Sequence, residues 1–162
     1  MAKGPEYNSS SVAKYYKIVA ENRKARFDYQ ILETCKAGLV LTGNEVKSIR
    51  LGRVNLKDSF GRIERGAIWI FGMHITPYGA AKADPLRPRK LLLTGRETLK
   101  LIGKVSEKGL TLIPLKIFFE GNWGKVELAL AKAKRKYEKR ETLRLRAVKR
   151  EIETAIKGKN RD

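Results

Sequence analysis

The sequence predicts a mainly β protein with flanking α-helices, folded as a small closed antiparallel barrel and followed by a basic C-terminal tail. Short segments of alternating apolar residues, separated by glycine-containing turns, predict the barrel. Signatures of helix starts predict two or three short helices, and a concentration of lysines and arginines near the C-terminus predicts the tail. A chain of 162 residues with 42% apolar content is long enough for one domain with a hydrophobic core.

The first β segments follow from the alternation of apolar side chains. Residues 17–22 and 29–41 are β-prone. Further along, the turn at residues 64–67 joins a strand that ends near Ile63 to a strand over residues 68–75.

The clearest hairpin lies in the last third of the chain. Apolar residues alternate over residues 110–119 and again over residues 126–130, on either side of turn residues 120–124. The parity of the alternation slips at Pro114, which predicts a β-bulge or an edge position there.

Two segments match a capping box, in which a Thr and a Glu three residues later satisfy each other's free backbone donors. They are Thr42 with Glu45 and Thr94 with Glu97. After the second box, one helical face is shared by Thr98, Leu101, Ile102 and Val105. The sequence therefore predicts short helices that begin just after Thr42 and Thr94.

The tail from residue 131 onward carries 13 basic and 5 acidic residues, a net charge of +8. It has no Phe or Trp and few apolar residues, so it cannot bury a core of its own. An apolar stripe with 3-4-4 spacing would line one side of a helix, and it consists of Leu145, Val148, Ile152 and Ile156. Because isolated helices of this length are marginal in water, we expect the tail to be disordered alone and helical when docked on a phosphate-lined surface.

The net charge of +19, from 36 basic and 17 acidic residues, is the strongest functional signal. Such an excess costs self-repulsion in a compact chain and calls for a polyanionic partner. We expect RNA first, DNA second and an anionic membrane surface third. No apolar run is long enough to span a bilayer and no signal-peptide core is visible, so we expect a cytoplasmic protein without a membrane partner.

Residues suited to catalysis or metal binding are scarce. Cys35 has no second cysteine for an internal disulfide, and together with His74 alone it cannot form a Cys/His zinc site. We interpret His74, at the end of an apolar strand, as structural. No close carboxylate pair and no phosphate-binding glycine-rich loop are evident. The sequence therefore favours binding over catalysis, without a cofactor.

Two basic segments in the first third of the chain could contact nucleic acid. Residues 22–29 combine three cations with two aromatic residues, which suits phosphate neutralisation and base stacking, or else a strand end with solvated charges. On the helix predicted after Thr42, Lys47 and Arg50 lie opposite the apolar face. Glu45 is explained more simply by its capping box.

Two further basic segments lie later in the chain. Residues 85–90 overlap the end of a loop that is predicted over residues 78–89, and they suit either a phosphate clamp or a solvated loop before a buried strand. We expect the three leucines at residues 91–93 to be core. Residues 132–140 form the densest basic cluster, where binding is favoured over simple solvation.

At these same segments the sequence resembles the SmpB (small protein B) family of SsrA-binding, or tmRNA-binding, proteins. Seven ordered blocks at consistent spacing carry the resemblance, between about Lys17 and Arg140. They fall at residues 22–26, 37–48, 55–59, 74–78, 85–93, 108–116 and 125–132, and include the sequences Asn-Leu-Lys-Asp-Ser and His-Ile-Thr-Pro-Tyr.

The resemblance implies an oligonucleotide-binding (OB) type barrel. We assign the RNA-binding barrel to residues 14–131, a flexible N-terminus to residues 1–13 and the basic tail to residues 132–162. The family binds the tRNA-like domain of tmRNA and delivers it to stalled 70S ribosomes for trans-translation. Its tail enters the empty mRNA channel beside the decoding centre and becomes helical there. We expect this protein to do the same, as a monomer.

The residues expected to bind RNA come from the four basic segments. They are Asn22, Lys24, Arg26, Glu45, Lys47, Arg50, Arg89, Lys90, Lys132, Lys134 and Arg135. The tail residues expected to contact the ribosome are Lys136, Tyr137, Glu138, Lys139, Arg140, Arg144, Arg146, Lys149 and Arg150.

The chain departs from the family pattern at five positions. Phe27 stands where the family usually has His, and Lys36 replaces an acidic residue, so no carboxylate contact to RNA transfers to that position. Thr94 replaces His or Asn but still serves as a helix cap. At Ala133 and Glu138 the basic residues that follow each position are kept. The family's glycine hinge, at the position of Ala133, is lost.

Two other functions remain open from the sequence. A general single-strand-binding protein of the same barrel type would prefer unstructured oligonucleotides. A small RNA-processing enzyme would show metal-dependent cleavage that disappears with one carboxylate substitution.

Overall fold

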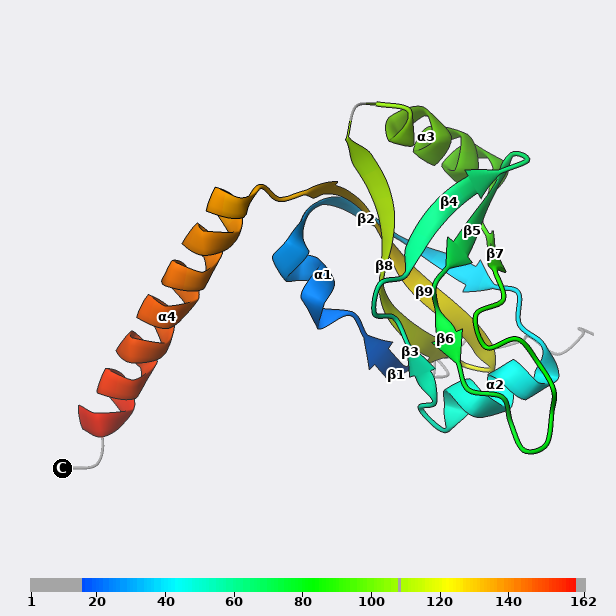
Figure 1. Ribbon diagram of the computed structural model, residues 1–162, viewed down its shortest axis with the longest axis horizontal. Helices are drawn as coiled ribbons and strands as arrows, with labels where there is room; N and C mark the ends of the chain where they lie inside the picture. Colours follow the sequence, from blue (N-terminus) through cyan, green and yellow to red (C-terminus); the bar gives the residue numbers. More distant parts are fainter. Residues whose placement is uncertain (1–15, 108, 160–162) are drawn as a thin grey trace, which may run out of the picture.

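The computed structural model describes residues 16–107 and 109–159, which form nine strands and four helices (Figure 1). The expected flexible segment at residues 1–13 lies outside the described residues. The strands are β1 (Tyr16–Glu21), β2 (Tyr29–Leu39), β3 (Val54–Asn55), β4 (Phe60–Glu64), β5 (Ala67–Phe71), β6 (His74–Ile75), β7 (Arg89–Leu92), β8 (Leu110–Glu120) and β9 (Trp123–Ala133). The helices are α1 (Arg23–Asp28), α2 (Gly43–Arg50), α3 (Gly95–Val105) and α4 (Lys136–Lys159).

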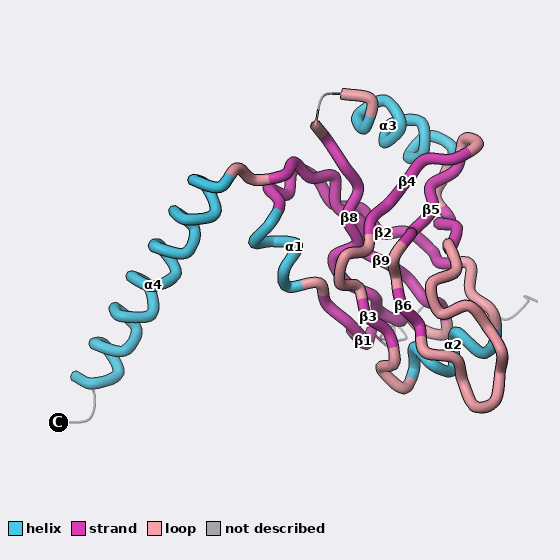
Figure 2. The backbone as a smooth tube through the Cα atoms, in the orientation of Figure 1, coloured by secondary structure: helices cyan, strands magenta, loops and turns pink. Residues whose placement is uncertain are grey.

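Seven strands form one antiparallel sheet in the order β1-β8-β4-β5-β7-β2-β9, and β9 also pairs with β8. The short strands β3 and β6 form a separate antiparallel pair. Figure 2 shows the strands grouped together, with α2 and α3 at opposite ends and α4 extending away. The structure therefore confirms the predicted mainly β, antiparallel fold with flanking helices.

Both hairpins predicted from the sequence are present. Arg65 and Gly66 join β4 to β5 with φ angles of 50° and 72°, a conformation that matches the twist of a tight hairpin. β8 and β9 pair along most of their length, and their register shifts between Pro114 and Lys116, where the sequence predicts a bulge.

Two details of the predicted strands are wrong. The strand predicted over residues 68–75 is interrupted at Gly72, which has a φ of 73°, and β6 then pairs with β3 instead of continuing the main sheet. The three consecutive leucines are not all core, since Leu91 is 4% exposed and Leu92 is 56% exposed. Successive side chains of β7 point to opposite faces, so only every second one is buried.

Buried apolar residues form two clusters on opposite faces of β8. At the centre of the larger cluster, Ile70, Ile117 and Leu128 are completely buried. The smaller cluster contains Ala25, Ile113, Leu115, Ala129 and Ala131. This second cluster packs the short helix α1 against the β8–β9 hairpin.

Helices α2 and α3 begin at the two predicted capping boxes, and both reciprocal hydrogen bonds are present in each. In α3 the predicted inward face is confirmed, with Leu101 buried and its helical neighbours half-buried. α1 is not predicted, because residues 22–29 were ambiguous between an RNA-binding segment and a strand end. The structure shows a six-residue helix capped by Asn22.

The basic tail forms a single helix, α4, which projects from the end of β9 (Figure 1). Its apolar stripe faces solvent, and Leu145, Val148, Ile152 and Ile156 are each more than half exposed. The structure thus contains the helix that the 3-4-4 spacing predicts, and it does not show the disorder expected of the free tail.

β4 approaches β8 at a single residue pair, Gly61 and Leu112. A Cβ atom on Gly61 would lie 2.7 Å from the Cβ of Leu112, closer than side chains approach in folded proteins. Glycine at this position therefore allows the sheet to continue from β8 to β4.

We expect Gly61→Ala to lower the free energy of unfolding by about 1–3 kcal/mol, because the added methyl group forces β4 away from β8. Urea unfolding measures the change. Gly103→Ala is the matched control, since nothing lies within 4 Å of a Cβ built at Gly103 on α3. That control should raise stability by up to about 1 kcal/mol through helix propensity. A Gly61→Ala protein as stable as the wild type would contradict the close approach.

Two ion pairs hold α3 against β2. Lys100 Nζ lies 2.6 Å from Glu33 Oε1, and Lys104 Nζ donates to Glu33 Oε2. The hydrogen bonds from Lys100 and Lys104 lower the pKa of Glu33 from 4.5 to about 2.

These pairs stabilise the fold only while Glu33 is ionised. Because the folded-state pKa lies below the unfolded value, the stabilisation is fully present above about pH 4.5 and is lost as the pH falls toward 2. We expect the wild type to be more stable than Glu33→Gln at neutral pH, and this difference to shrink steadily in acid. Urea unfolding of both proteins across the pH range tests this, and a difference independent of pH would be the contrary result.

Candidate nucleic-acid interface

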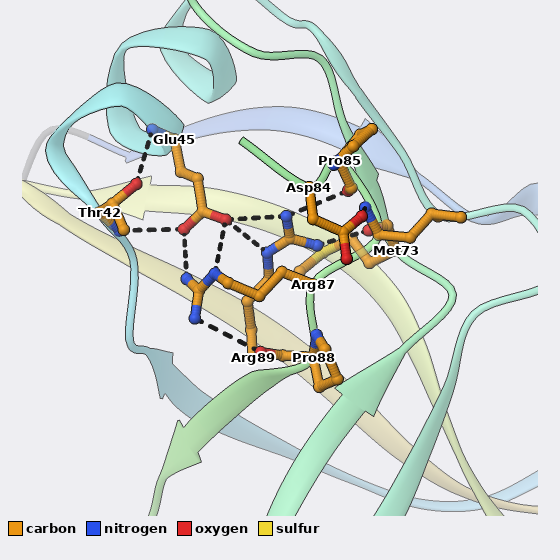
Figure 3. A network of polar contacts seen from close by, with 9 residues as sticks. Thr42, Glu45, Met73, Asp84, Pro85, Arg87, Pro88 and Arg89 are labelled. Carbon is orange, nitrogen blue, oxygen red and sulfur yellow. Dashed lines mark hydrogen bonds and ion pairs between the residues drawn. The ribbon is translucent and has the colours of Figure 1, made fainter. Parts of the chain in front are cut away.

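A network of buried and partly buried charges joins α2 to the start of β7 (Figure 3). Glu45 Oε2 accepts a hydrogen bond from Arg87 at 2.6 Å, and Glu45 Oε1 accepts one from Arg89 Nε at 2.9 Å. Arg89 also donates to the main-chain carbonyls of Met73 and Pro85, at 2.5 and 3.1 Å. One carboxylate thus fixes α2, the loop before β7 and the turn after β5 relative to one another.

Glu45 is ionised within this network. Burial alone raises the pKa of Glu45, but hydrogen bonds from Arg87, from the backbone of Thr42 and from Arg89 outweigh it and hold the pKa below its ordinary value. Glu45 is 7% exposed and Arg89 is completely buried. The prediction that these two side chains contact RNA is therefore corrected, because a buried guanidinium needs its paired carboxylate inside the protein.

The solvent-facing side of α2 is cationic, as the sequence predicts. Lys47 Nζ lies 5.3 Å from the centre of the Tyr78 ring, and Arg50 Cζ lies 5.5 Å from the centre of the Phe119 ring. Both cations are exposed, and the rings restrict where they point. We call Lys47 and Arg50 the α2 patch.

Lys90 is also exposed, on β7. It follows the buried Arg89 and points to the opposite face of the strand, across from Trp69. Of the two adjacent cations predicted to bind RNA at the start of this strand, only Lys90 is therefore accessible.

Asn22 has a structural role at the start of α1. Its Oδ1 accepts from the backbone N–H of Ala25 at 3.2 Å, and its Nδ2 donates to the carbonyls of Leu56 and Pro114, both at 3.3 Å. These bonds connect α1 to β8 and to the chain after β3. A contact between the Asn22 amide and RNA would have to compete with three internal hydrogen bonds.

Exposed cations of α1 lie beside the end of β9. Lys134 Nζ donates to the main-chain carbonyl of Arg26 at 3.3 Å, and the Lys134 N–H donates to the Asp28 carbonyl at 3.0 Å. The structure thereby brings together predicted RNA-binding residues from two distant segments. We call them the α1 patch, which consists of Lys24, Arg26, Lys132, Lys134 and Arg135.

Asp28 ties α4 to α1. Its Oδ1 lies 3.0 Å from Lys139 Nζ, and its Oδ2 lies 4.0 Å from Lys24 Nζ. Further along α4, Arg146 Cζ lies 5.6 Å from the centre of the Phe27 ring. These contacts fix the first three turns of α4 beside the α1 patch.

The other predicted ribosome-contacting residues of α4 vary in role. Glu138 Oε2 accepts from the backbone N–H of Arg135 at 2.8 Å and so caps the helix start. The remaining tail residues are exposed, and they are Lys136, Tyr137, Arg140, Arg144, Lys149 and Arg150.

Apart from Lys90, the accessible RNA-binding candidates outside α4 therefore form two separate groups, because α1 and α2 lie on different sides of β8 (Figure 1). Sequence reasoning missed Asp28 and Tyr78 as parts of these groups. Their contacts with Lys139 and Lys47 join residues that are far apart in the chain. For Tyr78, its place in the block at residues 74–78 was the available signal.

Side chains that could act in catalysis or bind a metal ion are few in the part of the chain that the structure describes. Burial raises the pKa of the Cys35 thiol, which makes it a poor nucleophile. Across residues 16–107 and 109–159, no three His, Cys, Asp or Glu side chains are placed to hold a metal ion. Within the same residues, no helix has the length and apolar character needed to cross a bilayer.

Comparisons with known proteins point to one family. A family model described as SmpB protein matches residues 19–158. The SsrA-binding protein of Carboxydothermus hydrogenoformans is 57% identical over 146 residues, which cover 88% of this chain and 98% of that protein. The SsrA-binding protein of Gloeobacter violaceus is 55% identical over 147 residues, covering 89% and 97%. A solved structure described as "tmRNA-SmpB: a journey to the center of the bacterial ribosome" is 47% identical with a TM-score of 0.64, covering 79% of this chain and 95% of that one.

Removing the buried partner of Glu45 should cost far more than removing the exposed one. Arg89→Met removes the completely buried partner of this carboxylate, and we expect the free energy of unfolding to fall by about 3–5 kcal/mol. The Arg87 side chain is 38% exposed. Arg87→Met should therefore cost about 1 kcal/mol or less. Urea unfolding of the two variants gives the comparison, and equal losses would refute the distinct roles of the two arginines.

Proposed function

The chain belongs to the SmpB protein family, and we propose that it is an SsrA-binding protein: it binds tmRNA and brings it to stalled ribosomes for trans-translation. The observation that carries this conclusion is the 57% identity to an SsrA-binding protein over 98% of that protein's length. The likeness to a structure described as a tmRNA–SmpB complex in the ribosome supports the ribosome as the second partner.

We also propose that the large sheet is an OB-type barrel. The pairings run from β8 through β4, β5, β7, β2 and β9 and then return to β8, which supports a closed ring of strands. In this description β1 is an additional strand on the edge of β8. A closed ring protects its strand edges from pairing with other chains.

The part of the chain that we propose binds the tRNA-like domain is the predicted RNA-binding unit, residues 14–131, together with the cations that follow it. The α1 patch and the α2 patch offer cations on two sides of β8, all of them exposed except the half-buried Lys134, and Lys90 adds a third position. Phosphates of a folded RNA can reach such separated cations, and neutralising them supplies much of the affinity. Because A-form RNA hides most base edges, specificity comes mainly from the shape of the RNA.

The tail, α4, is the proposed ribosome-contacting element. It carries 9 basic and 4 acidic residues, and most of its cations are exposed. A cationic helix of this kind suits a channel lined by ribosomal RNA phosphates. The protein then acts in the cytoplasm as a monomeric adaptor, without a cofactor and without a reaction of its own.

Removing α4 should separate the two activities. A chain that ends at Arg135 keeps β9 and the bond from Lys134 to Asp28, so the α1 patch stays in place. We expect its affinity for the isolated tRNA-like domain to fall by less than about tenfold, because most phosphate contacts remain. Tagging of nascent chains on stalled ribosomes should be lost in a reconstituted translation reaction. Tagging by the shortened chain would reject the two-part mechanism.

The same binding assay separates the proposal from a general single-strand-binding protein. Excess polyuridine should leave the complex of the full-length protein with the tRNA-like domain intact, because polyuridine lacks the folded shape. Displacement of the tRNA-like domain by polyuridine would favour the general single-strand-binding function.

A further inference from the structure

A hollow of about 310 Å³ lies between α1 and the turn that leads from β3 to β4. Its lining combines a cation, two carboxylates and two aromatic rings, from Lys24, Asp28, Tyr29, Asp58 and Phe60. Lys24 belongs to the α1 patch, so the hollow opens beside the surface to which the proposed function assigns tmRNA. A hollow of this volume is at the small end of ligand sites and suits a compact planar group such as one nucleobase.

Asp58 is held at the hollow in an uncommon backbone conformation. Its φ of 59° lies in the left-handed region, which few non-glycine residues adopt. The backbone N–H and the hydroxyl of Ser59 both donate to the Leu56 carbonyl, at 3.2 and 2.5 Å. On the other side, a Cβ at Gly72 would lie 2.9 Å from the Asp58 carbonyl oxygen. Strain that is maintained by such close surroundings is a feature of binding sites.

The two carboxylates of the hollow differ in their partners. Asp28 is engaged by Lys139 and Lys24. Asp58 is exposed, and within residues 16–107 and 109–159 its carboxylate has no hydrogen-bond or ion-pair partner. An ionised carboxylate only accepts hydrogen bonds, so a ligand at Asp58 must offer donors.

Phe60 supplies a flat apolar surface at the same place. Its ring stacks on Phe71 with the centroids 5.8 Å apart and an interplanar angle of 14°, and Phe60 remains 41% exposed. Unpaired RNA bases stack on aromatic rings of this kind while polar side chains read their Watson–Crick edges.

From this geometry we infer that the hollow is a subsite for one unpaired guanine of the bound RNA, an inference that rests on the proposed function. The base stacks on Phe60, and the two oxygens of Asp58 accept from its N1–H and its 2-amino group. Lys24 neutralises a neighbouring phosphate. This arrangement favours guanine, because the Watson–Crick edge of guanine carries two adjacent hydrogen-bond donors, which match the two acceptor oxygens of a carboxylate.

Asp58→Asn tests the subsite in the full-length protein. Asn adopts the left-handed conformation as Asp does, so the fold should be kept, as thermal melting can verify. Losing a negative charge would by itself tighten RNA binding. We expect the opposite, a loss of affinity for the tRNA-like domain of about fivefold to a hundredfold. Glu107→Gln is the matched control, since it removes an exposed carboxylate beyond α3 and should leave the affinity unchanged or slightly tighter.

Inosine, which lacks the 2-amino group, tests the identity of the base. The unpaired guanines of the tRNA-like domain are replaced by inosine one at a time. We expect one of these replacements to weaken binding by the wild type about fivefold or more. The same replacement should not weaken binding by Asp58→Asn any further. Phe60→Leu should weaken binding of the unmodified RNA about tenfold through lost stacking.

The outcomes separate the subsite from the proposed function. If the wild type does not bind the tRNA-like domain, the proposed function itself is overturned. A wild type that binds it, with Asp58→Asn and Phe60→Leu binding equally well, would overturn the subsite alone. Weaker binding by Asp58→Asn without any effect of inosine would overturn the assignment to guanine.

Discussion

The pairing of β8 along both its edges is the constraint on which the positions of the functional elements depend. β9 follows one edge, while β1 and β4 share the other and leave a gap between them. Asn22 fills that gap: its N–H donates to the Leu115 carbonyl at 2.6 Å, and its side chain donates to the Pro114 carbonyl at 3.3 Å. The bulge at Pro114 thus frees backbone acceptors that anchor α1, and with it the exposed cations beside the tail.

Local signals in the sequence were sufficient for much of this fold. The capping boxes at Thr42 and Thr94, the alternation in β8 and β9 and the slip at Pro114 each depend on residues a few positions apart. α1 was not predictable in this way, because the contacts of its cap with Leu56 and Pro114 come from distant parts of the chain. Leu92 is exposed because side chains alternate between the two faces of β7, whereas a run of three leucines by its composition indicates only core.

The candidate site was predictable as a set of cations but not in its division of roles. Composition alone cannot show that Lys90 is exposed while its neighbour Arg89 is buried, because the partner that buries Arg89, Glu45, is 44 positions away in the sequence. In a chain with twice as many cations as carboxylates, several of the carboxylates hold cations in place. Glu33 does so for α3, Glu45 for Arg87 and Arg89 at the start of β7, and Asp28 for the start of α4.

The junction between β9 and α4 has a mechanical consequence. Only Lys134 and Arg135 separate the strand from the helix, and the backbone of Lys134 is bonded to α1. At 1.5 Å per residue, the 24 residues of α4 span about 36 Å. The helix is therefore a projection of fixed length with its first residues held against α1. If α4 enters the mRNA channel, as proposed above, its length sets how much of that channel must be free of mRNA.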